Sequence, residues 1–131
     1  LGRLWAACGH DVTFAYSRDA RRRAQMAAAA GGTSGTIAEA VHDADALLLA
    51  LHWSRIAEVV DQAGDLSGKV VLNCCVPLDE ANENLVVGMT TSGAEELARL
   101  RPSAQWVSCF NTNPSESFEP VFRRKGQSPA P

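Results

Sequence analysis

The sequence predicts an α/β fold, in which a parallel sheet carries helices on both of its faces. Short runs of β-branched and apolar residues alternate with helical segments, at the spacing that crossovers between parallel strands require. The run Ala46–Leu51 is apolar throughout, which is typical of a strand covered on both faces. The length of 131 residues suits a single domain, and we expect one over residues 1–131.

The beginning of the chain carries clear boundary signals. A helical tail is expected to end at Gly9, which suits the left-handed position after a helix. The β-branched and aromatic run Val12–Tyr16 predicts a strand. Asp19 is expected to cap the next helix, which runs to Ala30 and stops at the pair Gly31–Gly32.

The following segment continues the alternation. Residues Thr33–Thr36 hold either a brief edge strand or a loop. Thr36 then caps a helix over Ile37–His42, and Glu39 stands three residues later as the partner in a capping box. After the strand Ala46–Leu51, Ser54 is expected to cap another helix.

The second half repeats this pattern. Val70–Val76 predicts a buried strand, which Pro77 ends because proline has no N–H for a central ladder. Residues 78–91 are polar and contain turn formers, so we interpret them as a surface loop. The remaining predicted elements are a helix over Gly93–Leu100 opened by Thr91 or Ser92, a strand over Gln105–Phe110, a short helical turn within Ser115–Phe118, and a loop to the end.

The end of the strand Val12–Tyr16 presents Ser17 and Arg18 side by side. Ligands of open α/β sheets bind beyond the carboxyl ends of the strands. A hydroxyl and a guanidinium can both donate hydrogen bonds to phosphate oxygens. In dinucleotide-binding folds, a carboxylate at this position selects NAD, whereas an arginine accommodates the 2′-phosphate of NADP. The pair therefore predicts an NADP(H)-binding domain.

Charge and composition exclude several other classes of function. The net charge of −3 gives no reason to expect nucleic acid or an anionic membrane as a partner. The longest apolar run is far shorter than the roughly 20 residues of a membrane span. The four cysteines form no C-x-x-C pair, and no cluster has metal-ligand spacing. We therefore expect a cytoplasmic protein with no metal site, in which Cys8, Cys74, Cys75 and Cys109 are reduced thiols within the core.

Six segments, in this order, resemble the NADP oxidoreductases that depend on coenzyme F-420, a deazaflavin. They are Gly9–Val12, Ser17–Arg18, Gly68–Val71, Val76–Leu78, Thr91–Ala98 and Phe110–Thr112. The resemblance implies a Rossmann domain whose first strand and glycine-rich loop hold the NADP pyrophosphate. Neither the loop nor that strand is found in this sequence, which begins within an apparent helix. We therefore expect a fragment that lacks the first strand, the glycine-rich loop and the last strand and helices.

The resemblance also implies where the cofactor binds. Ser17 and Arg18 correspond to the 2′-phosphate contacts, and Arg22 supplies a second cation one helical turn further along. The other implied cofactor positions lie beyond the ends of later strands: Leu51, His52, Trp53, Val76, Pro77, Asn111 and Thr112. For His52 we favour a backbone-positioning or packing role over proton transfer. We name no catalytic acid or base, because a cofactor carries the chemistry of hydride transfer.

Three functions remain open at this point. The first is an oxidoreductase that moves hydride between NADP(H) and coenzyme F-420 or a flavin-like acceptor. The second is an NADP-dependent reductase of a small imine or carbonyl compound. The third is a non-catalytic NADP-binding or interaction module. All three have small-molecule partners, and each is compatible with a homo-oligomer.

Overall fold

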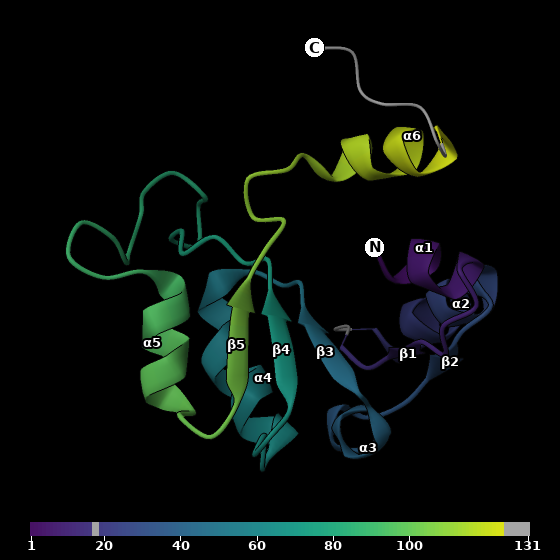
Figure 1. Cartoon of the computed structure of the whole chain (residues 1–131), viewed down its shortest axis with the longest axis horizontal. Coiled ribbons are helices and arrows are strands. Elements are labelled where there is room, and N and C mark those ends of the chain that lie inside the picture. Colours follow the sequence, from purple (N-terminus) through teal and green to yellow (C-terminus); the bar gives the residue numbers. More distant parts are fainter. Residues whose placement is uncertain (17–18, 125–131) are drawn as a thin grey trace. The chain divides into compact units, whose positions relative to one another are not determined.

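The computed structural model describes residues 1–16 and 19–124, and these residues form two compact units (Figure 1). The first unit joins Leu1–Gly35 to the C-terminal segment that begins at Thr112. The second unit is Thr36–Asn111. Each unit is an arrangement of short parallel strands and helices, as the sequence predicts. Every helix in the described ranges falls short of the length and apolarity needed to cross a bilayer.

The first unit contains a two-stranded parallel sheet with two N-terminal helices. Its elements are α1 (Gly2–Ala7), β1 (Thr13–Phe14), α2 (Ala20–Ala30) and β2 (Thr33–Ser34). As predicted, Asp19 caps α2 by accepting from two backbone N–H groups, and Gly31 ends it in the left-handed conformation with φ of 73°. Of the two alternatives left open for Thr33–Thr36, the structure shows the brief strand, β2, whereas β1 is shorter than the predicted Val12–Tyr16.

Two contacts hold this small sheet together. A Cβ on Gly32 would lie only 2.5 Å from the carbonyl oxygen of Val12, so only glycine allows the backbone to approach this closely. The guanidinium of Arg23 reaches across from α2, donating to Ser34 Oγ at 3.0 Å and to the carbonyl oxygen of Ala15 at 3.4 Å. Arg23 therefore belongs to the framework of this unit.

The C-terminal segment of the first unit is more helical than the sequence indicated. The short helical turn predicted within Ser115–Phe118 is the 3-10 turn η2 (Ser115–Ser117). It leads directly into the helix α6 (Phe118–Arg123), although we expected a loop after the turn. Pro120 obscured the helix in the sequence, but it lies in the first turn, where a missing N–H costs no helical hydrogen bond. An ion pair between Glu119 and Arg123, one turn apart, adds to the helix.

The second unit is built on a three-stranded parallel sheet. Its elements are α3 (Ile37–Asp43), β3 (Ala46–Leu49), the 3-10 turn η1 (Trp53–Arg55), α4 (Ile56–Ala63), β4 (Val70–Asn73), α5 (Gly93–Leu100) and β5 (Gln105–Ser108). The strand order is β3-β4-β5, and the register pairs Leu49 with Asn73 and Asn73 with Ser108. The carboxyl ends of all three strands therefore lie at one edge of the sheet, where a ligand is expected.

Helices cover this sheet with apolar side chains. Figure 1 shows α4 lying behind the three strands, and α4 contributes Ile56, Val59 and Val60 to the core. Leu97 of α5 and Val71 of β4 are each 2% exposed. At the opposite end of the sheet, the Lys69 ammonium donates to the carbonyl oxygens of His42 and Ala44, each at 3.0 Å, and so holds the end of α3.

Candidate functional site

A pocket of about 360 Å³ opens beyond the carboxyl ends of β3 and β4. This volume lies within the range of roughly 300–1,000 Å³ that small-molecule sites occupy. Among the described residues, those that line it are Ala50, Leu51, His52, Trp53, Cys74, Cys75, Val76, Leu78 and Asn82. None of these lining residues is Asp, Glu, Lys or Arg. The walls are therefore uncharged, with one indole, one imidazole and one amide among them.

The imidazole of His52 is held through both ring nitrogens. Nδ1 accepts from the backbone N–H of Ser54 at 3.3 Å and lies 2.9 Å from the Ser54 hydroxyl. Nε2 lies 3.0 Å from Oδ1 of Asn82. His52, and not Ser54, therefore caps the turn that leads into α4, so our expectation that Ser54 caps this helix was wrong. Histidine fills the role because its Nδ1 can accept two residues ahead, as an asparagine side chain does.

Asn82 is presented by a tight turn formed by residues 79–84. One Asp79 carboxylate oxygen accepts from the backbone N–H of Glu83 at 2.9 Å, and the other accepts from Nδ2 of Asn84 at 2.8 Å. These bonds, with the side chain of Asn84 contributing most, hold the pKa of Asp79 below its usual value of 3.8. Asn82 itself has φ of 62°, a conformation that asparagine tolerates better than most residues. The predicted surface loop is therefore ordered by its own carboxylate.

Trp53 is fixed against the start of α5. A Cβ on Gly93 would lie 3.0 Å from Cζ3 of the indole and 3.6 Å from Cγ of Pro77. Gly93 is buried, and the absence of a side chain lets the indole and the proline ring cover the helix terminus. Pro77 also accepts from the backbone N–H of Val86 at 2.9 Å, so it joins this packing to the loop that follows it.

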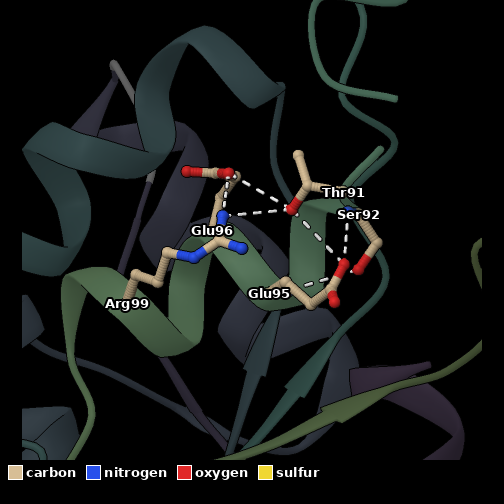
Figure 2. Close-up of polar contacts among 5 residues, drawn as sticks. All are labelled: Thr91, Ser92, Glu95, Glu96 and Arg99. Carbon is tan, nitrogen blue, oxygen red and sulfur yellow. Dashed lines mark hydrogen bonds and ion pairs between the residues drawn. The ribbon is translucent and has the colours of Figure 1, made fainter. Parts of the chain in front are cut away.

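The first turn of α5 is tied down by a compact polar network, which Figure 2 shows. Of the two residues expected to open this helix, Ser92 is the cap, and it forms a capping box with Glu95: the Ser92 N–H donates to the carboxylate at 2.7 Å, and the Glu95 N–H donates to the hydroxyl at 3.2 Å. Arg99 pairs with Glu96 and donates to the Thr91 hydroxyl at 3.1 Å. The helix behind Trp53 is therefore anchored independently of the pocket.

The thiols at the base of the pocket are bonded to the backbone of β3. Cys75 Sγ lies 3.2 Å from the carbonyl oxygen of Leu49 and accepts from the N–H of Leu51 at 3.5 Å. Burial raises the pKa of Cys75 to about 11 and also raises that of Cys74. All four cysteines are free thiols. Cys75 therefore packs as a neutral group that joins β3 to β4.

The structure brings together four of the positions implied for the cofactor: Leu51, His52, Trp53 and Val76 all line the pocket. Pro77 supports the wall through its contact with Gly93. Asn111 is exposed in the turn after β5 and is not among the lining residues.

The remaining implied positions lie elsewhere. Thr112 and Arg22 belong to the first unit, in which Arg22 is exposed in the first turn of α2. Its backbone N–H donates to Asp19 at 3.4 Å. The remaining two positions, Ser17 and Arg18, lie outside the described residues.

Sequence reasoning missed the contribution of the loop to the pocket. Leu78 and Asn82 line it, but the loop was interpreted only as polar surface. The available signal was Asp79 followed by Asn82 and Asn84, because closely spaced Asp and Asn side chains favour structured turns. All four cysteines were expected to be core thiols. Cys75 is buried in the core and also borders the pocket, whereas Cys74 and Cys109 are half-buried. The expectation was wrong for Cys8, which is exposed at the end of α1.

Comparisons with known proteins agree with this architecture. A hypothetical protein from Sinorhizobium meliloti superposes with a TM-score of 0.75 and 24% identity, over 88% of this chain and 57% of that one. A candidate F420-dependent NADP-reductase from Arthrobacter sp. FB24 superposes with a TM-score of 0.78 and 23% sequence identity, over 88% of this chain and 58% of that one. The chain thus spans little more than half the length of either structure, and at this identity the likeness establishes the α/β Rossmann-like fold.

The family comparison carries the assignment further. Residues 1–77, more than half of the 131-residue chain, match the family described as NADP oxidoreductase, coenzyme F420-dependent. This stretch includes β1, β3 and β4 together with most of the residues that line the pocket. The chain belongs to the family of coenzyme F420-dependent NADP oxidoreductases.

Proposed function

We propose that the chain forms an NADP(H)-binding domain of an oxidoreductase, and that it moves hydride between NADP(H) and coenzyme F-420 or a flavin-like partner. The observation that carries the proposal is the uncharged pocket at the carboxyl ends of β3 and β4, in a chain of this family. In open α/β sheets this edge is where a dinucleotide binds.

The residues of the pocket fit a nicotinamide ring. A flat aromatic ring with one carboxamide needs apolar and aromatic walls and a few polar groups that fix its orientation. Leu51, Trp53 and Leu78 supply apolar surface, and Asn82 supplies an amide. Phosphate groups, by contrast, require cations or backbone N–H groups, so the uncharged pocket suits the ring better than the pyrophosphate.

The chain's own residues act by holding the ring in place. NADPH, once bound, supplies the hydride, and the protein has to fix the distance and the exposed face of the ring. Trp53 is immobilised by Gly93 and Pro77, while both ring nitrogens of His52 are engaged by the chain. A wall whose side chains are already fixed loses little conformational entropy when the ligand binds.

The selectivity for NADP(H) is assigned to Ser17 and Arg18, with Arg22 as a second cation. In the sequence, Ser17 and Arg18 follow Tyr16, and β1 ends two residues earlier, at Phe14. The 2′-phosphate of NADP binds at the end of the corresponding strand in dinucleotide-binding folds, which supports this assignment. We also propose that residues 1–131 act as one nucleotide-binding domain, located in the cytoplasm. The four free thiols accord with such a reducing compartment.

Titration of the protein with NADPH and NADH, followed by the quenching of tryptophan fluorescence, tests the proposal. We expect tighter binding of NADPH, and loss of roughly tenfold or more of that affinity in Arg18→Ala with little change for NADH, because a charge-assisted bond to phosphate is lost. Arg99→Ala removes the same charge from α5 and serves as the matched control. Equal affinities for the two nucleotides, or a preference for NADH, would contradict the proposal.

A second assay identifies the hydride partner. Reduced coenzyme F-420 and NADP are mixed with the protein, and the absorbance of NADPH is followed. The same assay with NADPH and a panel of small imines and carbonyl compounds tests for a different reductase. We expect turnover with the deazaflavin, and turnover with the carbonyl panel alone would assign the chain to the other class.

A further inference from the structure

The turn of residues 79–84 is joined to the end of β3 by a side-chain bond, between Nε2 of His52 and Oδ1 of Asn82 (3.0 Å). We infer that Asn82 is a positioning residue of the pocket. It holds the imidazole of His52 and its own turn in the one arrangement that receives the nicotinamide half of the cofactor. This inference rests on the function proposed above and names a residue that sets the geometry of that site.

The bond specifies one form of the His52 ring. Nδ1 accepts from the backbone N–H of Ser54 and therefore carries no proton. In the neutral ring the proton is then on Nε2, which donates it to the amide oxygen of Asn82. With both nitrogens engaged by the chain, neither serves as a general base. This arrangement supports the positioning role that we favoured for His52.

The turn that presents Asn82 is also held by hydrogen bonds of its own. Asp79 holds it through the N–H of Glu83 and the side chain of Asn84. The N–H of Asn82 also donates to the carbonyl oxygen of Asp79 at 3.0 Å. The bond from His52 to Asn82 thus links two segments that are each held by other hydrogen bonds. Because few additional groups have to be ordered, little conformational entropy offsets the stabilisation that the bond provides.

Both partners of the bond line the pocket, together with Leu78 at the start of the loop. If the bond is lost, the turn and the imidazole are free to separate, and the ligand must restore their arrangement when it binds. The apparent affinity for the cofactor is then the intrinsic affinity multiplied by the fraction of molecules that are competent to bind it. For one hydrogen bond we expect a loss of about three- to tenfold in affinity for NADPH.

Variants at the two positions separate this role from simple stability. Asn82→Gly removes the acceptor while tolerating φ of 62°. His52→Asn keeps an acceptor for the N–H of Ser54 but cannot reach Asn82, whereas His52→Gln keeps a donor near the position of Nε2 and loses the cap. Glu80→Ala, at an exposed position in the same loop, is the matched control.

The experiment measures NADPH affinity and melting temperature for each variant, and the tautomer of His52 by ¹⁵N NMR of the free protein. We expect the protein to show the Nε2–H tautomer. Asn82→Gly and His52→Asn should each lose three- to tenfold in affinity, and the double variant should lose no more than either. His52→Gln should melt at a lower temperature yet bind NADPH almost as well as the parent does.

The contrary outcomes separate a failure of the proposed function from a failure of the positioning role. If the unmodified protein does not bind NADPH, the proposed function fails, and with it the role of Asn82 in cofactor binding. If the protein binds NADPH but Asn82→Gly binds equally well, the positioning role alone is overturned. The same conclusion follows from an Nδ1–H tautomer, from losses that simply add in the double variant, or from a loss of affinity that tracks melting temperature across all variants.

Discussion

The indole of Trp53 lies directly against the backbone of Gly93, although the two residues are far apart in the sequence. The start of α5 thereby supports one wall of the pocket at the ends of β3 and β4. A side chain at position 93 would make a tight contact with the indole, which would have to move by a few tenths of an ångström, so the identity of one glycine is linked to the placement of an aromatic wall.

Gly93→Ala should destabilise the protein by about 1–2 kcal/mol, because a Cβ would lie 3.0 Å from the indole and the packing would have to shift. The loss should appear as a lower urea midpoint and a shifted Trp53 emission in a background where Trp5 and Trp106 are Phe. Gly88→Ala is the matched control, since its Cβ would meet nothing closer than Leu85 at 3.8 Å. Equal midpoints for the two variants would show that the contact is loose.

The turn that carries Asn82 should be sensitive to acid. Asp79 has its pKa held below 3.8 in the folded protein, so its contribution to stability is fully present above that value. The contribution is lost as the pH falls through the lowered pKa and the carboxylate gains a proton. The amide ¹H shift of Glu83, which donates to Asp79, should therefore titrate with a midpoint below 3.8.

Asn84→Ala provides the control for this titration. The side chain of Asn84 is the largest cause of the lowered pKa, so its removal should move the midpoint upward, toward the usual value. A midpoint above 3.8 in the parent protein, or one that Asn84→Ala leaves unchanged, would show that the turn is not organised by this carboxylate.

Cys75 should resist alkylation. With its pKa raised to about 11 by burial, roughly one molecule in a thousand carries the reactive thiolate at pH 8. In a variant where Cys8, Cys74 and Cys109 are replaced by alanine, iodoacetamide should label Cys75 slowly in the native state and quickly in urea. Rapid native labelling would mean that this thiol is exposed in solution.

The raised pKa of Cys75 also predicts that the protein loses stability as the pH becomes alkaline. The pKa of Cys75 in the folded protein is raised above its usual value of 9.0, so the contribution of this thiol to the free energy of unfolding is fully present below pH 9. It is lost as the pH rises from 9 toward about 11, because only the unfolded chain gives up the proton in this window. A Cys75→Ala variant should lose less stability than the parent protein over this interval, as measured by urea denaturation.

The cap of α5 should be worth about 1 kcal/mol. Ser92→Ala removes the acceptor for the N–H of Glu95 and should lower the free energy of unfolding by roughly this amount. Ser92→Asp keeps an acceptor at the same position and should restore most of the loss. If the alanine and aspartate variants unfold at the same urea concentration, the capping box shown in Figure 2 contributes little.

Local signals made much of the fold predictable. Thr36 with Glu39, Gly31 after its helix, and the apolar run within Ala46–Leu51 each act over a few residues, and the structure confirms the cap, the helix end and the strand. The helix α6 was missed because Pro120 is a helix breaker everywhere except in a first turn, and the sequence does not reveal where that turn begins.

The candidate site was less predictable because its key contacts are long-range. The parallel order of β3 and β4 places Leu51, His52, Trp53 and Val76 at one edge, which the topology alone can predict. The bond from His52 to Asn82 spans thirty residues and depends on a left-handed backbone within an irregular loop. No periodicity or propensity encodes such a contact, so it had to be observed.

Arg23 has a consequence for how the arginine run Arg21–Arg23 should be counted. Its guanidinium is already engaged by Ser34 and the backbone of Ala15, so it is committed to the internal architecture of the first unit. Both acceptors are neutral, so Arg23 keeps its positive charge, but two of its five N–H donors are already used. An arginine that serves the framework can thus attract an anion at a distance while being restrained from moving to bind it.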